Sequence, residues 1–228
     1  MEFRTWEPVY ETILDEFGYD RRGDERARDV LAELVAPFDT ARLDFAGRRV
    51  AVAGAGPSLA AETDRAADAD AVIAASTAAA TLRDAGVAVD CMVTDLDGTP
   101  ETAAELTEEG VPVAVHAHGD NVDAVREWVP RFDGEQVLPT TQAEPAGPVE
   151  NVGGFTDGDR AAFLADHVGA AELTFVGWDF DDPDVSEAKG RKLRWAERLL
   201  YWLERRRGDR FDVLAGRRDG LSLPWAAE

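Results

Sequence analysis

Lysine and cysteine are scarce in this sequence. The only cysteine among the 228 residues is Cys91, which excludes an internal disulfide, and its place in an apolar run predicts a small buried side chain. The only lysines are Lys189 and Lys192. Positive charge is low overall, because 24 Lys and Arg stand against 46 Asp and Glu and leave a formal net charge of −22. Nucleic-acid backbones and anionic membranes would repel such a surface, which argues against either as the main partner.

Long apolar runs are also missing. No stretch reaches the ~18 apolar residues of a membrane span, and residues 1–17 lack the basic and apolar regions of a secretory signal. We therefore expect a cytoplasmic, soluble protein. The excess acid is spread through every segment. This distribution is typical of the salt-adapted surface of a halophilic organism, and an acidic interaction protein is the less favoured interpretation.

The sequence does contain a regular alternation of short apolar runs and longer amphipathic segments. Six strand-like runs lie at 48–54, 71–76, 87–94, 111–117, 135–140 and 172–177. The alternation predicts an α/β fold with a doubly wound, mostly parallel sheet. We expect an N-terminal helical extension (1–44), a catalytic α/β domain (45–206) and a C-terminal tail (207–228).

The first strand is followed by GAGPSL, residues 54–59. Its glycines, Gly54 and Gly56, allow close backbone approach, and Ser58 can cap the next helix and leave N–H groups free for an anion. Leu59 stands where the third glycine of a dinucleotide-binding fingerprint belongs, so a nicotinamide site is not favoured. A plain tight turn and a phosphate or substrate contact both remain open here.

Carboxylates follow the third and fourth strands. Asp95 and Asp97 lie in VTDLDGT, and Asp120 lies in HAHGDN. Asp-x-Asp occurs at four other places, so the spacing alone proves nothing; the position at strand ends is what favours a ligand site over a solvated turn. Hard oxygen ligands at that edge suit Mg²⁺. The His116-x-His118 pair suggests zinc less strongly, because no cysteine or third histidine lies near it in the sequence.

Further candidates follow in the second half. Residues 141–154 form a long loop rich in Gly and Pro, which is typical of a functional lid. Thr156 can cap the helix that follows, and Phe155 offers an aromatic face to a flat heterocycle. Lys189 and Lys192 begin a long helix, where phosphate contact is favoured over an ordinary surface role.

Six strings occur together in order: GAGPSL, VTDLDG, HAHGDN, TTQ at 140–142, GGFTDGDRA, and GWDF ahead of the lysine-bearing helix. Over roughly residues 45–205 they resemble the archaeal 6-hydroxymethyl-7,8-dihydropterin pyrophosphokinases of the MptE type. HAHGDN and GFTDGDRA are the most specific parts. TDLDG also resembles the GDLDS-type motif of thiamin pyrophosphokinases, to which this family looks related.

The resemblance implies transfer of a diphosphate from ATP to 6-hydroxymethyl-7,8-dihydropterin, with release of AMP, in tetrahydrofolate or tetrahydromethanopterin synthesis. It implies Mg²⁺, and the composition would suit a haloarchaeal member. The expected catalytic residues are Asp95, Asp97, Asp120 and Lys189, of which the three aspartates are the expected metal ligands. The residues expected to bind ATP are Gly54, Gly56, Ser58, His118, Asn121, Arg160 and Lys192. The residues expected to bind the pterin are Gln142, Asn151, Gly154, Phe155, Thr156, Asp157 and Asp179.

Two other functions remain in view. DLDGT also matches the opening motif of haloacid-dehalogenase-type phosphatases, in which Asp95 would be the nucleophile and Asp97 the acid/base. That hypothesis explains one motif only, and two strands precede the motif here. A non-catalytic module that recruits a partner through its acidic surface is the third hypothesis. Oligomeric state, including a homo-oligomer, stays open. The group that accepts the hydroxyl proton also stays open, with Asp120 as the candidate.

Overall fold

The computed structural model describes residues 1–225 and contains a six-stranded parallel sheet in the order β5-β4-β3-β2-β1-β6. The strands are β1 Arg49–Ala53, β2 Ala71–Ala75, β3 Cys91–Thr94, β4 Val113–Ala117, β5 Val137–Thr141 and β6 Glu172–Val176. Both faces of the sheet are covered, so β2, β3, β4 and β5 are buried along their whole length. The predicted α/β class and parallel sheet are confirmed.

The third strand begins later than the sequence pattern predicts, at Cys91 instead of residue 87. The preceding helix ends at Asp84, Gly86 follows it with φ 76°, and the Val87 N–H donates to Leu82 O at 2.9 Å. Residues 87–90 are therefore a connection back to the sheet, although their apolar composition is that of a strand.

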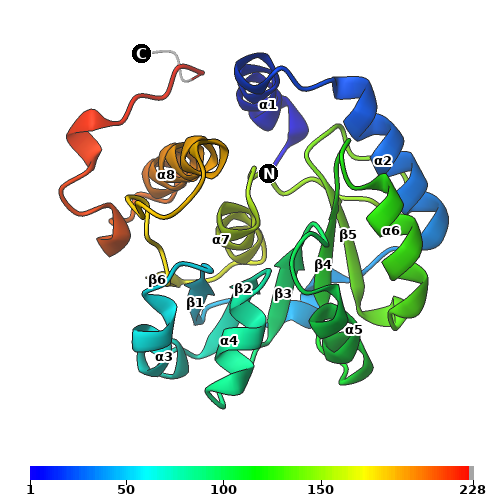
Figure 1. The fold of residues 1–228 in the computed structure, drawn as a ribbon, viewed down its shortest axis with the longest axis horizontal. Coiled ribbons are helices and arrows are strands. Elements are labelled where there is room, and N and C mark those ends of the chain that lie inside the picture. Colours follow the sequence, from blue (N-terminus) through cyan, green and yellow to red (C-terminus); the bar gives the residue numbers. More distant parts are fainter. Residues whose placement is uncertain (226–228) are drawn as a thin grey trace.

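Helices cover the two faces of the sheet (Figure 1). The α-helices are α1 Phe3–Phe17, α2 Arg21–Leu34, α3 Leu59–Ala67, α4 Ala78–Asp84, α5 Pro100–Glu108, α6 Val122–Trp128, α7 Asp157–His167 and α8 Glu187–Arg207. Short 3₁₀ helices lie at Thr40–Leu43, Val129–Arg131, Gly134–Gln136, Asp212–Leu214 and Arg218–Gly220. Helices α1, α7 and α8 share one core with one face of the sheet, and α2 to α6 share a second core with the other face.

The N-terminal extension packs against both faces of the sheet, with α1 on one face and α2 on the other. Trp6 of α1 is fully buried, its ring lies 6.4 Å from those of Phe163 and Trp202, and its Nε1 donates to Gln142 O at 2.9 Å. Helix α2 packs beside α6, β4 and β5 at the opposite end of the sheet from β6. The two helices therefore bring N-terminal residues to the carboxyl edge of the sheet. None of the helices within residues 1–225 has the length and apolarity needed to cross a membrane.

The chain reverses its direction across the sheet after β5. Strands β1 to β5 follow one another outward, and α7 then crosses back over β3, β2 and β1 so that β6 pairs with the free side of β1. The connections after β1 and β6 therefore lead to helices on opposite faces of the sheet, and ligand sites in such sheets lie near this switch point, at the carboxyl ends of the strands. The same crossing places the first turn of α7 above the end of β3.

Candidate active site

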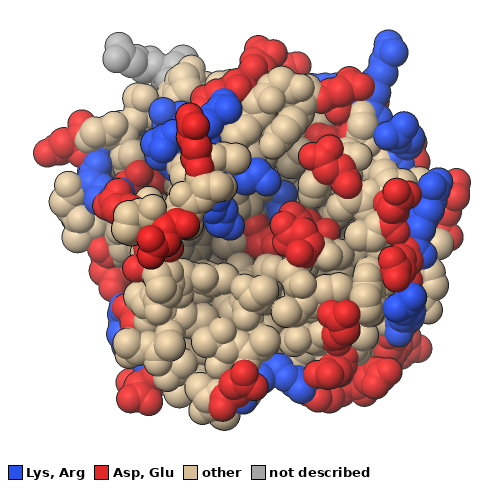
Figure 2. Space-filling view, in the orientation of Figure 1, with Lys and Arg blue, Asp and Glu red and all other residues tan. Residues whose placement is uncertain are grey.

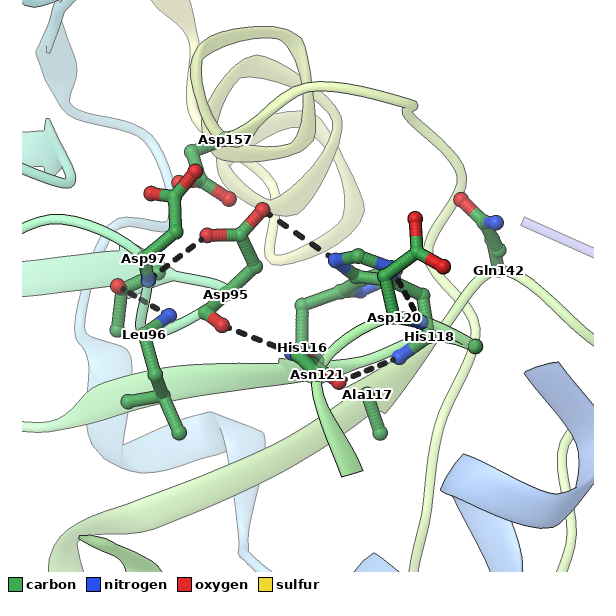
Figure 3. A network of polar contacts seen from close by, with 12 residues as sticks. Asp95, Leu96, Asp97, His116, Ala117, His118, Asp120, Asn121, Gln142 and Asp157 are labelled. Atoms are coloured by element: carbon green, nitrogen blue, oxygen red, sulfur yellow. Dashed lines mark hydrogen bonds and ion pairs between the residues drawn. The ribbon is translucent and has the colours of Figure 1, made fainter. Parts of the chain in front are cut away.

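The turn after β3 aims two carboxylates in one direction. Leu96 has φ 71°, and its N–H donates to Thr94 Oγ1 at 2.9 Å. Asp97 N–H donates to Asp95 Oδ1 at 3.2 Å, which folds the turn back on itself. A Cβ at Gly98 would lie 2.5 Å from Ser76 Oγ, so the turn packs against the end of β2. Asp95 and Asp97 consequently lie close together above the sheet edge (Figure 3).

A third carboxylate joins this pair from the start of α7. Asp95, Asp97 and Asp157 each offer an oxygen, and these oxygens lie within 4.8 Å of one another. Figure 3 shows Asp157 descending from the helix toward the other two. Three carboxylate oxygens at this spacing are the ligand type that Mg²⁺ or Ca²⁺ takes. The sequence placed Asp157 in the pterin site instead.

Asp120, the third expected metal ligand, does not lie in this group of carboxylates. Its side chain is exposed, and its N–H donates to His118 Nδ1 at 3.4 Å. His118 lies between Asp120 and Asp95 (Figure 3). The turn after β4 is one strand farther from α7 than the turn after β3 is. Helix α7 therefore supplies the third carboxylate of the group, and the turn after β4 does not.

The protonation equilibria reflect this crowding. Burial opposes ionisation of Asp95, but the His118 hydrogen bond and the Arg160 charge outweigh it and hold the pKa of Asp95 well below its usual range. Burial and the charge of Asp95 raise the pKa of Asp97. Burial, again with the charge of Asp95, raises the pKa of Asp157 to about 8. Even with the charge of Arg160 nearby, the three carboxylates therefore share a region where not all of them stay ionised unless a further cation binds.

His116, His118 and Asn121 make different contacts in the site. His118 Nε2 lies 3.4 Å from Asp95 Oδ2, whereas His116 is buried with its Nδ1 3.1 Å from Thr140 Oγ1. Burial lowers the pKa of His116 well below its usual value. Asn121 Nδ2 donates to Asp95 O at 2.8 Å and to His116 O at 2.7 Å, and Oδ1 accepts from His118 N–H at 3.0 Å. Asn121 therefore ties the ends of β3 and β4 together, although the sequence predicted a contact with ATP.

Helix α7 begins with a capping box, as predicted from Thr156. Asp159 Oδ2 accepts from Thr156 N–H at 3.0 Å and from Thr156 Oγ1 at 2.7 Å. Arg160, only 4% exposed, forms an ion pair with Asp157 Oδ1 at 2.8 Å and donates to the carbonyl oxygen of Phe155. A cation is thus buried beside the three carboxylates.

The two lysines lie in the first two turns of α8, near the carboxylates. Ser186 caps α8 by accepting from Lys189 N–H at 3.2 Å, which fixes the first turn of the helix. Lys189 and Lys192 are close enough to Asp97 to oppose the rise in its pKa that burial and Asp95 cause. Figure 2 shows blue side chains gathered over a hollow, with red side chains beside it.

The sequence left a tight turn and a phosphate or substrate contact open for the glycine loop after β1, and in the structure its N–H groups have partners within the protein. The N–H groups of Gly54, Gly56 and Ser58 already donate to Val176 O, Gly177 O and Asp179 Oδ2, each at 2.9 Å. The protein's own Asp179 thus takes the place expected for a phosphate at the start of α3, and Ser58 Oγ lies 3.5 Å from Glu62 instead of capping the helix.

The glycines of that loop serve close packing. A Cβ at Gly54 would lie 2.6 Å from Gly177 O, and one at Gly56 would lie 2.7 Å from the same oxygen. The loops after β1 and β6 can approach this closely only without side chains at these positions.

Two cavities meet at the carboxylates. The first, which we call the α8 cavity, has a volume of about 270 Å³ and includes all three carboxylates, both lysines, the glycine loop and Trp178. The second, the α2 cavity, has a volume of about 260 Å³ and includes Tyr19, Asp24, His118, Asp120, Gln142 and Arg160. Asp95, Phe155 and Lys192 line both. This arrangement offers two binding sites with a shared boundary at Asp95.

The expected binding residues are distributed differently between these cavities. From the predicted ATP set, Gly54 and Gly56 line the α8 cavity, but His118 and Arg160 line the α2 cavity. The predicted pterin set divides as well: Gln142 lines the α2 cavity, whereas Thr156, Asp157 and Asp179 line the α8 cavity.

Asn151 was also predicted to bind the pterin, but its Nδ2 donates to the backbone oxygens of Gln142 and Ala143 at 2.9 and 2.7 Å. The loop that contains it is not the expected lid, because Glu150 pairs with the β5 edge through Pro139 and Thr141.

Sequence reasoning missed the residues that come from the N-terminal helices. Asp24 is 3% exposed, and its Oδ1 accepts from Gly119 N–H at 2.7 Å. Its Oδ2 accepts from Tyr10 OH at 2.7 Å and Gln142 Nε2 at 2.8 Å. Asp24 lies in a strongly charged helix sequence, RRGDERARD, whose pattern gives no signal that one of its acids is buried.

The sequence is similar to a known protein family and to three characterised proteins. The model of the family described as "6-hydroxymethylpterin diphosphokinase MptE-like" matches residues 27–185. The 6-hydroxymethyl-7,8-dihydropterin pyrophosphokinase of Methanothermobacter thermautotrophicus is 39% identical over 225 residues, which cover 90% of this chain and 96% of that protein. The protein of the same name from Pyrococcus furiosus is 39% identical over 223 residues, covering 90% of this chain and 95% of its own length.

A more distant relative has the same name. The 6-hydroxymethyl-7,8-dihydropterin pyrophosphokinase of Methanocaldococcus jannaschii is 30% identical over 232 residues, covering 90% of this chain and 96% of its own. These matches run through the glycine loop, the carboxylate turn and α7, whereas the phosphatase hypothesis accounted for DLDGT alone. The chain therefore belongs to the MptE-like family of 6-hydroxymethylpterin diphosphokinases.

Proposed function

We propose that this protein transfers a diphosphate from ATP to the hydroxymethyl group of 6-hydroxymethyl-7,8-dihydropterin and releases AMP. The hydroxyl oxygen forms a bond to the β-phosphorus, the bond from that phosphorus to the oxygen shared with the α-phosphate breaks, and the hydroxyl proton is lost. The acceptor is the one that the names of three relatives give. Tetrahydrofolate or tetrahydromethanopterin synthesis is the expected setting.

One observation carries this proposal: Asp95, Asp97 and Asp157 converge in the α8 cavity, and Asp95 also lines the α2 cavity. Phosphoryl transfer asks the protein mainly for positioning and for neutralisation of charge on the oxygens. A bisubstrate reaction needs two sites that meet at the reacting atoms, and Asp95 lies at such a meeting point. Mg²⁺ held by the three carboxylates would neutralise the triphosphate oxygens and draw the two substrates together.

The remaining positive charge comes from side chains of the chain itself. Lys189 and Lys192 line the α8 cavity beside the carboxylates and would contact phosphate oxygens directly. Arg160 is held by Asp157 and Phe155, so it supplies a fixed charge from beneath the group. Fixed cations of this kind stabilise negative charge that develops in the transition state.

The decisive experiment incubates the protein with ATP, Mg²⁺ and 6-hydroxymethyl-7,8-dihydropterin at high salt and identifies the nucleotide product. AMP in equal amount to a diphosphorylated pterin is the expected result. ADP or free phosphate as the product would overturn the proposal.

The phosphatase hypothesis makes a separate prediction. Beryllium fluoride mimics an aspartyl phosphate, so it should inhibit a phosphatase that uses Asp95 as nucleophile and leave AMP formation by the kinase largely unchanged.

The variant Asp97→Asn tests the non-catalytic hypothesis. If the protein is a non-catalytic module, this variant should keep partner binding. If the protein is the proposed kinase, the variant should lose turnover.

A further inference from the structure

We propose that the ring of the dihydropterin binds in the α2 cavity and that Tyr19, Asp24 and Gln142 recognise it. This inference rests on the proposed function and adds to it the place of the acceptor. It gives the N-terminal helices a direct part in substrate specificity. Neither the family match, which begins at residue 27, nor the sequence motifs assign a role to Tyr19 or Asp24.

The placement of the three carboxylates decides which substrate takes which cavity, because both cavities contain basic side chains: Arg26, Arg160 and Lys192 line the α2 cavity, and Lys189 and Lys192 line the α8 cavity. All three carboxylates and both lysines line the α8 cavity, whereas only Asp95 and Lys192 of that set reach the α2 cavity. A triphosphate with its cation needs the full set, so the nucleotide belongs in the α8 cavity. The acceptor must then approach from the other side of the boundary, through the α2 cavity.

The deep end of the α2 cavity presents hydrogen-bond acceptors. A carboxylate offers about four lone-pair positions, and Asp24 uses three of them for Gly119, Tyr10 and Gln142, two on Oδ2 and one on Oδ1. One position on Oδ1 is therefore left. Gln142 Nε2 donates to Asp24, and its Oε1, which has the side chain of His116 as a neighbour, keeps a second lone pair as an acceptor. The amino group and ring N–H of a 2-amino-4-oxo heterocycle are donors that match two neighbouring acceptors.

The wall of the cavity presents aromatic surface. Tyr19 is 37% exposed, and its ring centroid lies 6.5 Å from that of Phe155. Phe17 stacks against Tyr19 at 5.4 Å with an interplanar angle of 22°, so the ring is supported from one side. A flat bicyclic ring would cover aromatic surface that is otherwise in contact with water.

The turn after β4 sets the orientation of the substrate. Its Gly119 N–H donates to Asp24 and its His118 contacts Asp95, so this turn connects the two carboxylates that line the cavity. In a 6-hydroxymethyl pterin the hydroxymethyl group lies at the opposite end of the bicycle from the 2-amino group. With the amino edge at Asp24, the hydroxyl is therefore directed to Asp95 and the nucleotide beyond it.

The test measures the two substrates separately by titration calorimetry. The probes are Mg²⁺ with the α,β-methylene analogue of ATP, which cannot release AMP, and then dihydropterin added to protein saturated with that analogue. Tyr19→Ala should weaken dihydropterin binding by about tenfold and change analogue binding by less than about twofold. Asp24→Asn should weaken dihydropterin binding further, and its retained analogue binding shows that the variant is folded. Leu34→Ala is the matched control, since Leu34 is an exposed apolar residue of the same helix pair.

Three results would count against this assignment. If both variants lose affinity for the analogue and keep that for dihydropterin, the two substrates occupy the opposite cavities. If dihydropterin binding is unchanged while the wild-type protein still forms AMP, the acceptor site is wrong and the proposed function stands. If the wild-type protein forms no AMP with dihydropterin, the proposed function fails and this inference fails with it.

Discussion

The role of Asp157 in the folded structure differs from the role that its sequence position predicts. In the sequence it is the first acid of a capped helix, a position that the helix dipole alone explains. In the molecule its carboxylate oxygen lies within 4.8 Å of ligand oxygens of Asp95 and Asp97, and burial raises its pKa to about 8. Burying three like charges is unfavourable, and a divalent cation is the partner that offsets it.

The first prediction separates Asp157 from Asp120 as the third ligand. Asp157→Asn should weaken Mg²⁺ binding and lower turnover by about two orders of magnitude or more, because it removes one of the three carboxylates proposed to bind the metal directly. Asp120→Asn should retain the wild-type affinity for Mg²⁺, since this exposed residue lies beyond His118. Calorimetric titration with Mg²⁺ measures the affinity, and circular dichroism checks the fold. A larger loss of affinity in Asp120→Asn would restore the ligand set expected from the sequence.

The second prediction concerns pH. Burial and Asp95 raise the pKa of Asp157 to about 8, so below that pH the group holds a proton that a metal ion must displace. The apparent affinity for Mg²⁺ should therefore increase with pH, by up to about tenfold per unit, and level off above pH 8. Titrations across this range in the wild type and in Asp157→Asn test it. A wild-type slope that Asp157→Asn keeps would assign the proton to another group.

The start of α7 is the element on which the site depends. Gly153 and Gly154 have φ 89° and 95°, and a Cβ at Gly154 would lie 2.6 Å from Arg160 Cα. The chain can therefore turn sharply onto the helix while Arg160 packs behind the turn. This turn positions the start of α7, and therefore places Asp157 beside the turn after β3.

The third prediction tests that turn. Gly154→Ala should destabilise the protein by about 1–3 kcal/mol and lower Mg²⁺ affinity, because both the positive φ and the contact with Arg160 oppose a side chain. Gly134→Ala is the control, since its Cβ would have no heavy atom within 4 Å. Urea unfolding gives the free energies. Equal stability of the two variants would show that the turn can relax without cost.

At the scale of the whole molecule, charge is the dominant feature. The net charge is −22, and Figure 2 shows red side chains spread around the rim of the visible face. Many arginines form ion pairs at the surface, such as Arg83 with Glu109 at 2.7 Å, but the acids outnumber them. Self-repulsion therefore opposes the compact state at low ionic strength.

The fourth prediction follows from screening of that repulsion. The Debye length falls from about 8 Å at 0.15 M salt to about 3 Å at 1 M. The melting temperature should therefore rise as KCl increases over this range. Thermal unfolding followed by circular dichroism measures the shift, with glycerol in place of KCl as an uncharged control. A melting temperature that stays constant or falls with KCl would contradict a salt-adapted surface.

Much of the fold could be predicted because its signals are local. Each strand of the sheet is a short apolar run, and each run was visible in the sequence apart from the late start of β3 at Cys91. Asp95 and Asp97 were identifiable because they follow a strand directly. Lys189 and Lys192 were identifiable because lysine occurs nowhere else.

The sequence by itself determined the parallel α/β class, the acidic surface and the presence of carboxylates at a strand end, because period, composition and strand-end position are properties of neighbouring residues. Only the tertiary structure decided that Asp157 replaces Asp120 in the carboxylate group and that Asp24 lines the second cavity. The first depends on α7 crossing back over the sheet, and the second depends on α2 packing beside β5. Both arrangements are set by burial of distant apolar surfaces, which leaves no mark in the local pattern around either aspartate.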